Sequence, residues 1–206
     1  MLLVEDLTLD IPHADAWCSH RLQLKCGSVL HLCGDNGVGK STFLRCLAGL
    51  YPAKGKLSFD GGAHNYSSLD WPSLFTVIQN DYNGLVHTVG DCLRMLYAIY
   101  MSKPITPIDM QNVAVKLQLP TDAVCTKLSM GQKKRLMLAP FLFVKRRIWL
   151  LDEPFVYLDD LWCEQLLEWI SLCKQADAVI VLSMHNAGSK VKHVIDDVFR
   201  LERVNV

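Results

Sequence analysis

The chain has 206 residues, half of them hydrophobic, and its 21 basic and 21 acidic residues give a formal net charge of zero. This length predicts one compact domain over residues 1–206, with ample apolar material for a core. The balanced charge provides no overall basic surface, so the sequence predicts no nucleic-acid partner.

The cysteines and the amino-terminal residues bear on the compartment. None of the eight cysteines stands at C-x-x-C spacing, which argues against a zinc site or a redox motif and indicates a reducing compartment. The first residues, MLLVEDLTLDI, carry acidic side chains where a secretory or import signal carries basic ones. No apolar run approaches the roughly 18 residues that span a bilayer. We therefore expect work at a membrane to depend on docking to another subunit.

The first part of the chain is expected to form strands and one helix. Residues 2–11 are rich in apolar and β-branched side chains, and residues 21–25 alternate, so these segments can pair as an amino-terminal antiparallel part. A helix over residues 41–50 is ended with the help of Gly49 and Pro52. The other strands expected here lie at 29–33, within 56–62 and at 74–79.

The middle of the chain changes to a helical pattern. Apolar residues recur at helical spacing between residues 85 and 126, with a break at Pro104 and Pro107. This region is the candidate helical subdomain, about residues 81–145, inserted into the core. Strands return at 148–151 and 178–183, with a helix at 160–174 between them and a final strand within 196–204. Buried strands alternating with helices indicate an α/β fold with a parallel sheet covered on both faces.

A phosphate-binding loop follows the strand at 29–33. Residues 34–42 read GDNGVGKST and fit G-x-x-x-x-G-K-[ST]. The glycines let successive N–H groups turn inward as an anion nest, and the helix that follows adds the positive end of its dipole. Lys40 is expected to reach the β- and γ-phosphates, Ser41 to bind Mg²⁺ and Thr42 to support the α-phosphate. A glycine-rich turn that matches by chance is the alternative, and the strand–loop–helix context disfavours it. The predicted nucleotide-binding residues are Gly34, Asp35, Asn36, Gly37, Val38, Gly39, Lys40, Ser41 and Thr42.

Two carboxylates end the apolar strand in WLLDEP. Asp152 is placed beside the Mg²⁺ ion and Glu153 toward the attacking water, which it can orient or deprotonate. An acidic cap on the next helix is the alternative reading. The presence of a phosphate loop favours the catalytic one.

The segment LSMGQ, Leu128–Gln132, decides among the classes of phosphate-loop protein. A serine followed by a glycine at a helix start can offer a hydroxyl and N–H groups to an anion, although it can also be an ordinary helix cap. LSMGQKKRL resembles the LSGGQ signature of ATP-binding cassette (ABC) ATPases. The order of phosphate loop, signature and acidic strand end also matches that family.

The resemblance covers nearly the whole chain and implies further roles. It implies the P-loop NTPase fold of ABC ATPases, with ATP and Mg²⁺ as ligands. Gln79 matches the Q-loop glutamine, which would join Ser41 and Asp152 around Mg²⁺ and sense the γ-phosphate. Asp159 matches the D-loop aspartate and His185 the switch histidine. The resemblance also implies an ATPase dimer, either a homodimer, which we expect here, or a pairing with a second ATPase. In it each copy completes the partner's ATP site with its signature, here Ser129, Met130, Gly131 and Gln132.

Within the family, LSMGQKKRLMLAPFLFVKRRIWLLDEPFVYLDD and NGLVHTVGDCL look most like the ATPase subunits of cytochrome c maturation complexes, the CcmA group. That implies integral membrane subunits as partners and coupling of ATP hydrolysis to haem export or release of a haem-loaded chaperone. It implies a place on the cytoplasmic face of a bacterial inner membrane or on the matrix face of the mitochondrial inner membrane. The alternatives are the ATPase of another small ABC transporter, a soluble ABC ATPase, and a nucleotide-gated module with little hydrolysis.

Several residues depart from the family pattern. Met130 and Tyr157 stand where small residues are usual, in the signature and the D-loop. Pro140 is expected to kink the signature helix, because proline removes a backbone hydrogen bond. No aromatic residue stands clearly at the adenine position. His13 is a weak substitute, and Trp17 is better explained by packing.

Overall fold

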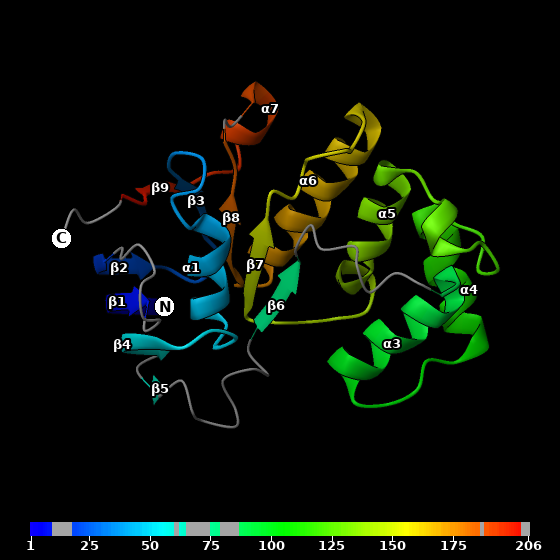
Figure 1. The fold of residues 1–206 in the computed structure, drawn as a ribbon, viewed down its shortest axis with the longest axis horizontal. Helices are drawn as coiled ribbons and strands as arrows, with labels where there is room; N and C mark the ends of the chain where they lie inside the picture. Colours follow the sequence, from blue (N-terminus) through cyan, green and yellow to red (C-terminus); the bar gives the residue numbers. More distant parts are fainter. Residues whose placement is uncertain (10–17, 60–61, 65–74, 79–86, 186–187, 203–206) are drawn as a thin grey trace. The chain divides into compact units, whose positions relative to one another are not determined.

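A computed structural model describes residues 1–9, 18–59, 62–64, 75–78, 87–185 and 188–202 (Figure 1). The chain divides into two compact units that alternate along the sequence. The first unit consists of Met1–Gln79, Arg146–Pro154 and Leu167–Val206, and the second of Asn80–Lys145 and Phe155–Leu166.

The first unit contains a four-stranded antiparallel sheet in the order β2-β1-β4-β5. Strand β1 pairs on both sides, with Val4 opposite Leu22 of β2 and Leu57 of β4. Alternate residues of β1 and β2, among them Leu2, Val4 and Leu24, are buried, as expected for a sheet with one face on the core. The strands are β1 (Leu2–Leu9), β2 (Cys18–Leu24), β4 (Ala53–Phe59) and β5 (Gly62–His64).

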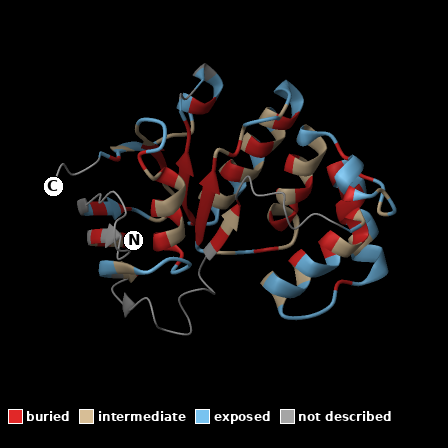
Figure 2. Cartoon of the chain, in the orientation of Figure 1, coloured by how far each residue is buried: buried red, intermediate tan, exposed pale blue. Residues whose placement is uncertain are grey.

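The second sheet of this unit is parallel and carries the phosphate loop. Its order is β6-β7-β8-β3-β9, so the strand that enters the loop lies between β8 and β9. Strands β7 and β8 are buried along their whole length, which explains their continuous apolar sequences (Figure 2). The strands are β3 (Val29–Cys33), β6 (Phe75–Ile78), β7 (Ile148–Asp152), β8 (Val179–Ser183) and β9 (Asp197–Arg200).

Helix α1 (Lys40–Leu47) packs against β7 and β8 through its apolar side. Phe43 and Leu47 of this helix are fully buried, and the Phe43 ring stacks on Phe199 of β9 at 6.0 Å between centroids. The core of the first unit therefore lies directly beneath the phosphate loop and holds the helix that the loop starts. A short helix, α7 (Ser189–Lys192), follows β8 and was not predicted.

The second unit is helical. Thr88 caps α3 in a reciprocal capping box with Asp91, and Thr106 caps α4, whose first residue is Pro107. Its helices are α3 (Val89–Met101), α4 (Pro107–Leu117), α5 (Met130–Met137) and the 3₁₀ helices η1 (Cys125–Lys127) and η2 (Ala139–Leu142), and α6 (Asp160–Gln175) shares its residues between the two units. Across the described residues, no helix has the length and apolar character needed to cross a membrane.

Two expectations about helix ends need correction. The expected kink at Pro140 is wrong, because α5 ends at Met137 and Pro140 lies in the first turn of η2, where no N–H is needed. The helix expected over 41–50 ends at Leu47, because Gly49 takes a positive φ of 71° and the N–H of Leu50 donates to the carbonyl of Arg45.

Candidate active site

The phosphate loop joins the carboxyl end of β3 to the start of α1. Gly37 and Gly39 both have positive φ, 74° and 104°, and Gly39 is the N-cap of α1. A residue with a side chain rarely adopts these angles, so the two glycines permit the turn that brings backbone N–H groups together at the helix start. Gly37 and Gly39 were expected from the sequence to permit this turn, and both take the positive φ angles that it requires.

Lys40 is buried, with 7% of its surface exposed, and its ammonium lies over the loop. Its Nζ donates to the carbonyl oxygens of Gly34 at 2.8 Å and Asp35 at 3.0 Å. An ammonium has three donors, so by count one more can serve an anion. The positive charge and the amino end of α1 together favour a phosphate group here.

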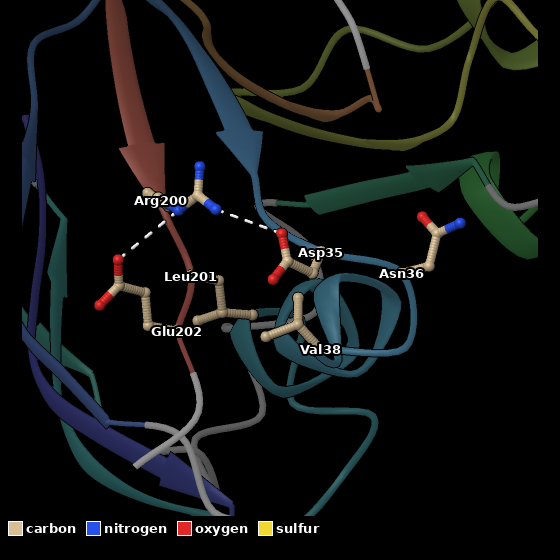
Figure 3. Close-up of a pocket in the computed structure, with 6 residues that line it drawn as sticks. All are labelled: Asp35, Asn36, Val38, Arg200, Leu201 and Glu202. Atoms are coloured by element: carbon tan, nitrogen blue, oxygen red, sulfur yellow. Dashed lines mark hydrogen bonds and ion pairs between the residues drawn. The ribbon is translucent and has the colours of Figure 1, made fainter. Parts of the chain in front are cut away.

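The carboxyl end of β9 lies beside the phosphate loop (Figure 3). The N–H of Leu201 donates to the carbonyl of Cys33 at 2.8 Å, and a Cβ on Gly34 would lie only 2.7 Å from the carbonyl oxygen of Leu201. Arg200 forms ion pairs with Asp35 at 3.2 Å and Glu202 at 3.5 Å. These side chains are well exposed, so the ion pairs add little stability, and the close backbone packing at Gly34 holds the loop. A cavity of about 410 Å³ here is lined by Asp35, Asn36, Val38, Arg200, Leu201 and Glu202.

Asp152 is the last residue of β7 and Glu153 follows it, at the same edge of the sheet as the loop. Asp152 is buried, with 8% of its surface exposed, and its Oδ1 accepts a hydrogen bond of 2.6 Å from the hydroxyl of Ser183. The register pairs these two residues across β7 and β8. One carboxylate oxygen is thus fixed by a neutral donor, and the carboxylate keeps acceptor capacity for a cation.

Glu153 has an unusual backbone conformation, with φ of 44°. Such a conformation costs a non-glycine residue on the order of 1 kcal/mol and persists only where neighbours hold it. Here the N–H of Glu153 donates to both the carbonyl oxygen of Ser183 at 3.1 Å and its hydroxyl oxygen at 3.0 Å. The strained turn directs the Glu153 side chain toward His185, whose Nε2 lies 3.2 Å from Glu153 Oε1.

The loop, Glu153 and His185 line one cavity of about 300 Å³. Both side chains are partly exposed in it, 31% for Glu153 and 48% for His185. The structure thus brings together predicted residues from three segments, and the cavity is lined by Asn36, Gly37, Gly39, Lys40, Ser41, Thr42, Glu153 and His185.

The donor set in this region suits a nucleotide with Mg²⁺. Ser41 offers a hydroxyl and Asp152 a carboxylate, both hard oxygen ligands, and Mg²⁺ in phosphate sites takes few protein ligands and completes its shell with phosphate and water. Within the described ranges, no group of three or more His, Cys, Asp or Glu side chains is placed to hold a metal ion.

The signature segment belongs to the second unit and starts α5. Ser129 is the N-cap and forms a capping box: its Oγ accepts from the N–H of Gln132 at 3.2 Å, and Gln132 Oε1 accepts from the N–H of Ser129 at 2.8 Å. Because this bond uses Ser129 Oγ as an acceptor, the hydroxyl still has a hydrogen to donate to an anion. Ser129 can therefore cap α5 and donate a hydrogen bond to an anion at the same time. Met130, the first residue of α5, is 40% exposed.

Gly131 packs against the D-loop. A Cβ at this position would lie 2.8 Å from the carbonyl oxygen of Tyr157, which has a positive φ of 68°. Close approach of the two backbones thus requires glycine in the signature. The D-loop residue Asp159 accepts a hydrogen bond of 2.9 Å from the N–H of Trp162 and so caps α6.

Some predicted residues lie outside the described part of the chain: Gln79, His13, Trp17 and residues 83–86 of the NGLVHTVGDCL segment. Sequence reasoning in turn overlooked Ser183, which contacts both Asp152 and Glu153. Its signal was a hydroxyl at the last position of a buried apolar strand, two residues before His185, where a polar group needs a partner.

Comparison with known proteins agrees with this geometry. Residues 19–156 match the ABC transporter family. The thiamine import ATP-binding protein ThiQ of Vibrio vulnificus is 31% identical over 169 residues, which cover 78% of this chain and 70% of ThiQ. The cytochrome c biogenesis ATP-binding export protein CcmA of Legionella pneumophila is 29% identical over 188 residues, or 90% of this chain and 92% of CcmA. ABC transporter I family member 1 of Arabidopsis thaliana is 33% identical over 177 residues, 77% and 70% of the two chains.

Solved structures share the fold at lower identity. An ATP-binding subunit of an ABC transporter superposes with a TM-score of 0.79 at 24% identity and covers 98% of this chain and 85% of its own. The ATP-binding cassette MJ0796, a dimer bound to ADP and Pi, superposes with a TM-score of 0.78 at 18% identity over the full length of both chains. These likenesses confirm the predicted combination of parallel sheet, amino-terminal antiparallel sheet and helical part.

Proposed function

The chain belongs to the ABC transporter family and is an ABC-type ATPase, and from that premise we propose that it powers a membrane complex for cytochrome c biogenesis. In this role, ATP binding and hydrolysis are coupled to haem export or to release of a haem-loaded chaperone. ABC ATPases in general bind ATP with Mg²⁺ and act as dimers with membrane subunits. Here we propose a homodimer on the cytoplasmic or matrix face of the membrane.

One observation carries the specific role. The likeness to the Legionella CcmA extends over 90% of this chain and 92% of CcmA, so the two proteins correspond nearly end to end. ThiQ is slightly more identical, but the match covers 70% of its length. The correspondence in length supports the cytochrome c role.

The geometry supports the following division of labour in hydrolysis. The phosphate loop and Lys40 bind the phosphates, and Ser41 and Asp152 would hold Mg²⁺, which would neutralise charge on the phosphates. Glu153 orients the attacking water and accepts its proton, and His185 contacts the γ-phosphate. The 3.2 Å between the Glu153 and His185 side chains keeps both on one side of the cavity.

We propose the remaining roles from the family. Gln79 senses the γ-phosphate and joins the Mg²⁺ shell, and Asp159 lies at the dimer contact. Residues 129–132 face the ATP held by the partner copy, and the hydroxyl of Ser129 donates to its γ-phosphate. Loss of that phosphate removes the bridge and lets the dimer open, which moves the attached membrane subunits.

A second candidate is the ATPase of another small importer, favoured by the 31% identity to ThiQ. A nucleotide-gated module with little hydrolysis is disfavoured, because Glu153 and His185 line the same cavity as the phosphate loop.

The test is in-gel haem staining of c-type cytochromes in cells that lack this chain. These cells are complemented with the wild-type chain or with Glu153→Gln, which keeps the side-chain volume but cannot take up a proton. We expect staining to return with the wild-type chain alone. Staining that persists in the deletion strain would refute the cytochrome c role.

Thiamine provides the control for the second candidate. The deletion strain is grown with and without added thiamine, and haem staining is repeated. Missing cytochromes in both media support the proposal. Normal cytochromes together with a loss of labelled-thiamine uptake by the deletion strain would assign the chain to thiamine import.

A further inference from the structure

We propose that Ser183 is a positioning residue for ATP hydrolysis: its buried hydroxyl fixes Asp152 for metal binding and holds Glu153 in its strained turn. Ser183 is fully buried at the carboxyl end of β8. Ser183 is not among the residues that line the cavity at the phosphate loop, so its effect on the site is exerted through the two acidic residues.

The Ser183 hydroxyl both donates and accepts a hydrogen bond at the end of β8. Its hydrogen is donated to Asp152 Oδ1 at 2.6 Å, and its oxygen accepts from the N–H of Glu153 at 3.0 Å. The short distance to Asp152 is that of a hydrogen bond to a charged acceptor. One side chain therefore sets the orientation of the metal-binding carboxylate and the backbone of the residue that handles the water.

The end of β8 is itself held from its other side. The Nε2 of the buried His31 lies 3.1 Å from the carbonyl oxygen of Met184, and because a carbonyl only accepts, Nε2 is the donor. The register places Leu32 of β3 beside Ser183, opposite its Asp152 neighbour. The strand end thus has little freedom to move, which lets Ser183 transmit a fixed position to the site.

The position explains the conformation of Glu153. A φ of 44° is unfavourable for glutamate, and the two bonds from its N–H to the oxygens of Ser183 compensate for it. Without the hydroxyl, one of these bonds remains and Asp152 loses its only side-chain donor among the described contacts. Asp152 can then turn away from the metal, and Glu153 can relax away from His185.

The experiment compares Ser183→Ala and Ser183→Thr with the wild-type chain. Mn²⁺ is used in place of Mg²⁺, and its binding together with ATP is measured by electron paramagnetic resonance on the full-length chain. ATPase rates are measured against Mg²⁺ concentration in the complex that co-purifies with the chain. We expect Ser183→Ala to weaken Mn²⁺ binding and raise the half-saturating Mg²⁺ concentration by about tenfold, as for other residues that orient metal ligands. Ser183→Thr, which keeps the hydroxyl, should restore most of both.

Thr76→Val is the matched control. Thr76 is another fully buried hydroxyl residue of the same sheet, in β6, and its Oγ1 has no hydrogen-bond partner among the described residues. This variant should leave the metal dependence unchanged. If Ser183→Ala fails to fold, Ser183→Cys retains the volume with a much weaker donor and takes its place.

Two results would overturn the proposal. One is a metal dependence of Ser183→Ala, or of Ser183→Cys in its place, equal to that of Thr76→Val. The other is that Ser183→Ala weakens ATP binding measured without Mn²⁺ as much as it weakens Mn²⁺ binding, and that Ser183→Thr restores neither. Ser183 would then be needed for folding in general. This experiment does not depend on the proposed haem role. If the haem role proved wrong, the proposal on Ser183 would be unaffected.

Discussion

Gly34→Ala is expected to weaken ATP binding strongly, because the added methyl group would have no room. Its carbon would lie 2.7 Å from the carbonyl oxygen of Leu201 and 3.0 Å from Cγ1 of Val38. Favourable contacts of carbon begin at about 3.5 Å, so the overlap is on the order of 0.5 to 1 Å. Leu201 cannot easily yield, since its N–H is bonded to Cys33 at 2.8 Å and β9 pairs with β3.

The energetic cost follows from these contacts. Overpacking costs about 1–3 kcal/mol, and the φ of 149° adds about 1 kcal/mol for a residue with a side chain. If about 2 kcal/mol of this cost destabilises the ATP-binding conformation of the loop and not the whole fold, the Kd for ATP rises about 30-fold.

The assay is titration of a fluorescent ATP analogue against the full-length chain, with thermal unfolding measured in parallel. Gly188→Ala serves as the control, because a Cβ there meets no atom of the described residues within 4 Å and its φ of −56° suits alanine. Equal Kd values for the two variants would refute the view that Leu201 and the loop are packed backbone against backbone.

Two further predictions concern the helical unit. Gly131→Ala should lower the ATPase rate at least about tenfold while ATP binding stays unchanged. Its methyl would lie 2.8 Å from the Tyr157 carbonyl oxygen and disturb the surface that we propose to act only in the dimer; an unchanged rate would contradict this. The pKa of the Asp91 carboxyl is lowered from 3.8 to about 2 by the hydrogen bond from the Thr88 side chain, then by those from Arg94 and the Thr88 backbone. Its capping contribution should therefore be complete above about pH 4 and decline as the pH falls toward 2, and a carboxyl ¹³C titration with a midpoint near 4 would contradict this.

The sequence predicted those parts of the site that depend on neighbouring residues. The phosphate loop carries its own glycines, lysine and hydroxyls in one segment, and its turn follows from positive φ at Gly37 and Gly39. Asp152 and Glu153 could be placed because a buried parallel strand must end at the same sheet edge as β3. The loop residues could be predicted from their local chemistry, and the two carboxylates from the sheet edge that their strand shares with β3.

Relations between distant residues could not be predicted. Ser183 meets Asp152 only because β7 and β8 pair in one particular register, and a single sequence does not reveal registers. The thiols of Cys92 and Cys125, 3.5 Å apart and both buried, likewise come together through folding across 33 residues, and C-x-x-C spacing could not detect them. The kink predicted at Pro140 assumed a longer helix, and the local sequence does not reveal that α5 ends at Met137, before the proline.

The packing of Leu201 behind Gly34 also orders events during synthesis of the chain. The phosphate loop leaves the ribosome early, but β8 and β9, which flank and support β3, begin more than 130 residues after the loop ends at Thr42. Contacts this distant in sequence form late in folding. A nascent chain therefore carries the complete phosphate-binding sequence without a supported loop, and ATP can first bind tightly only when residues near 201 have emerged and β9 has joined the sheet.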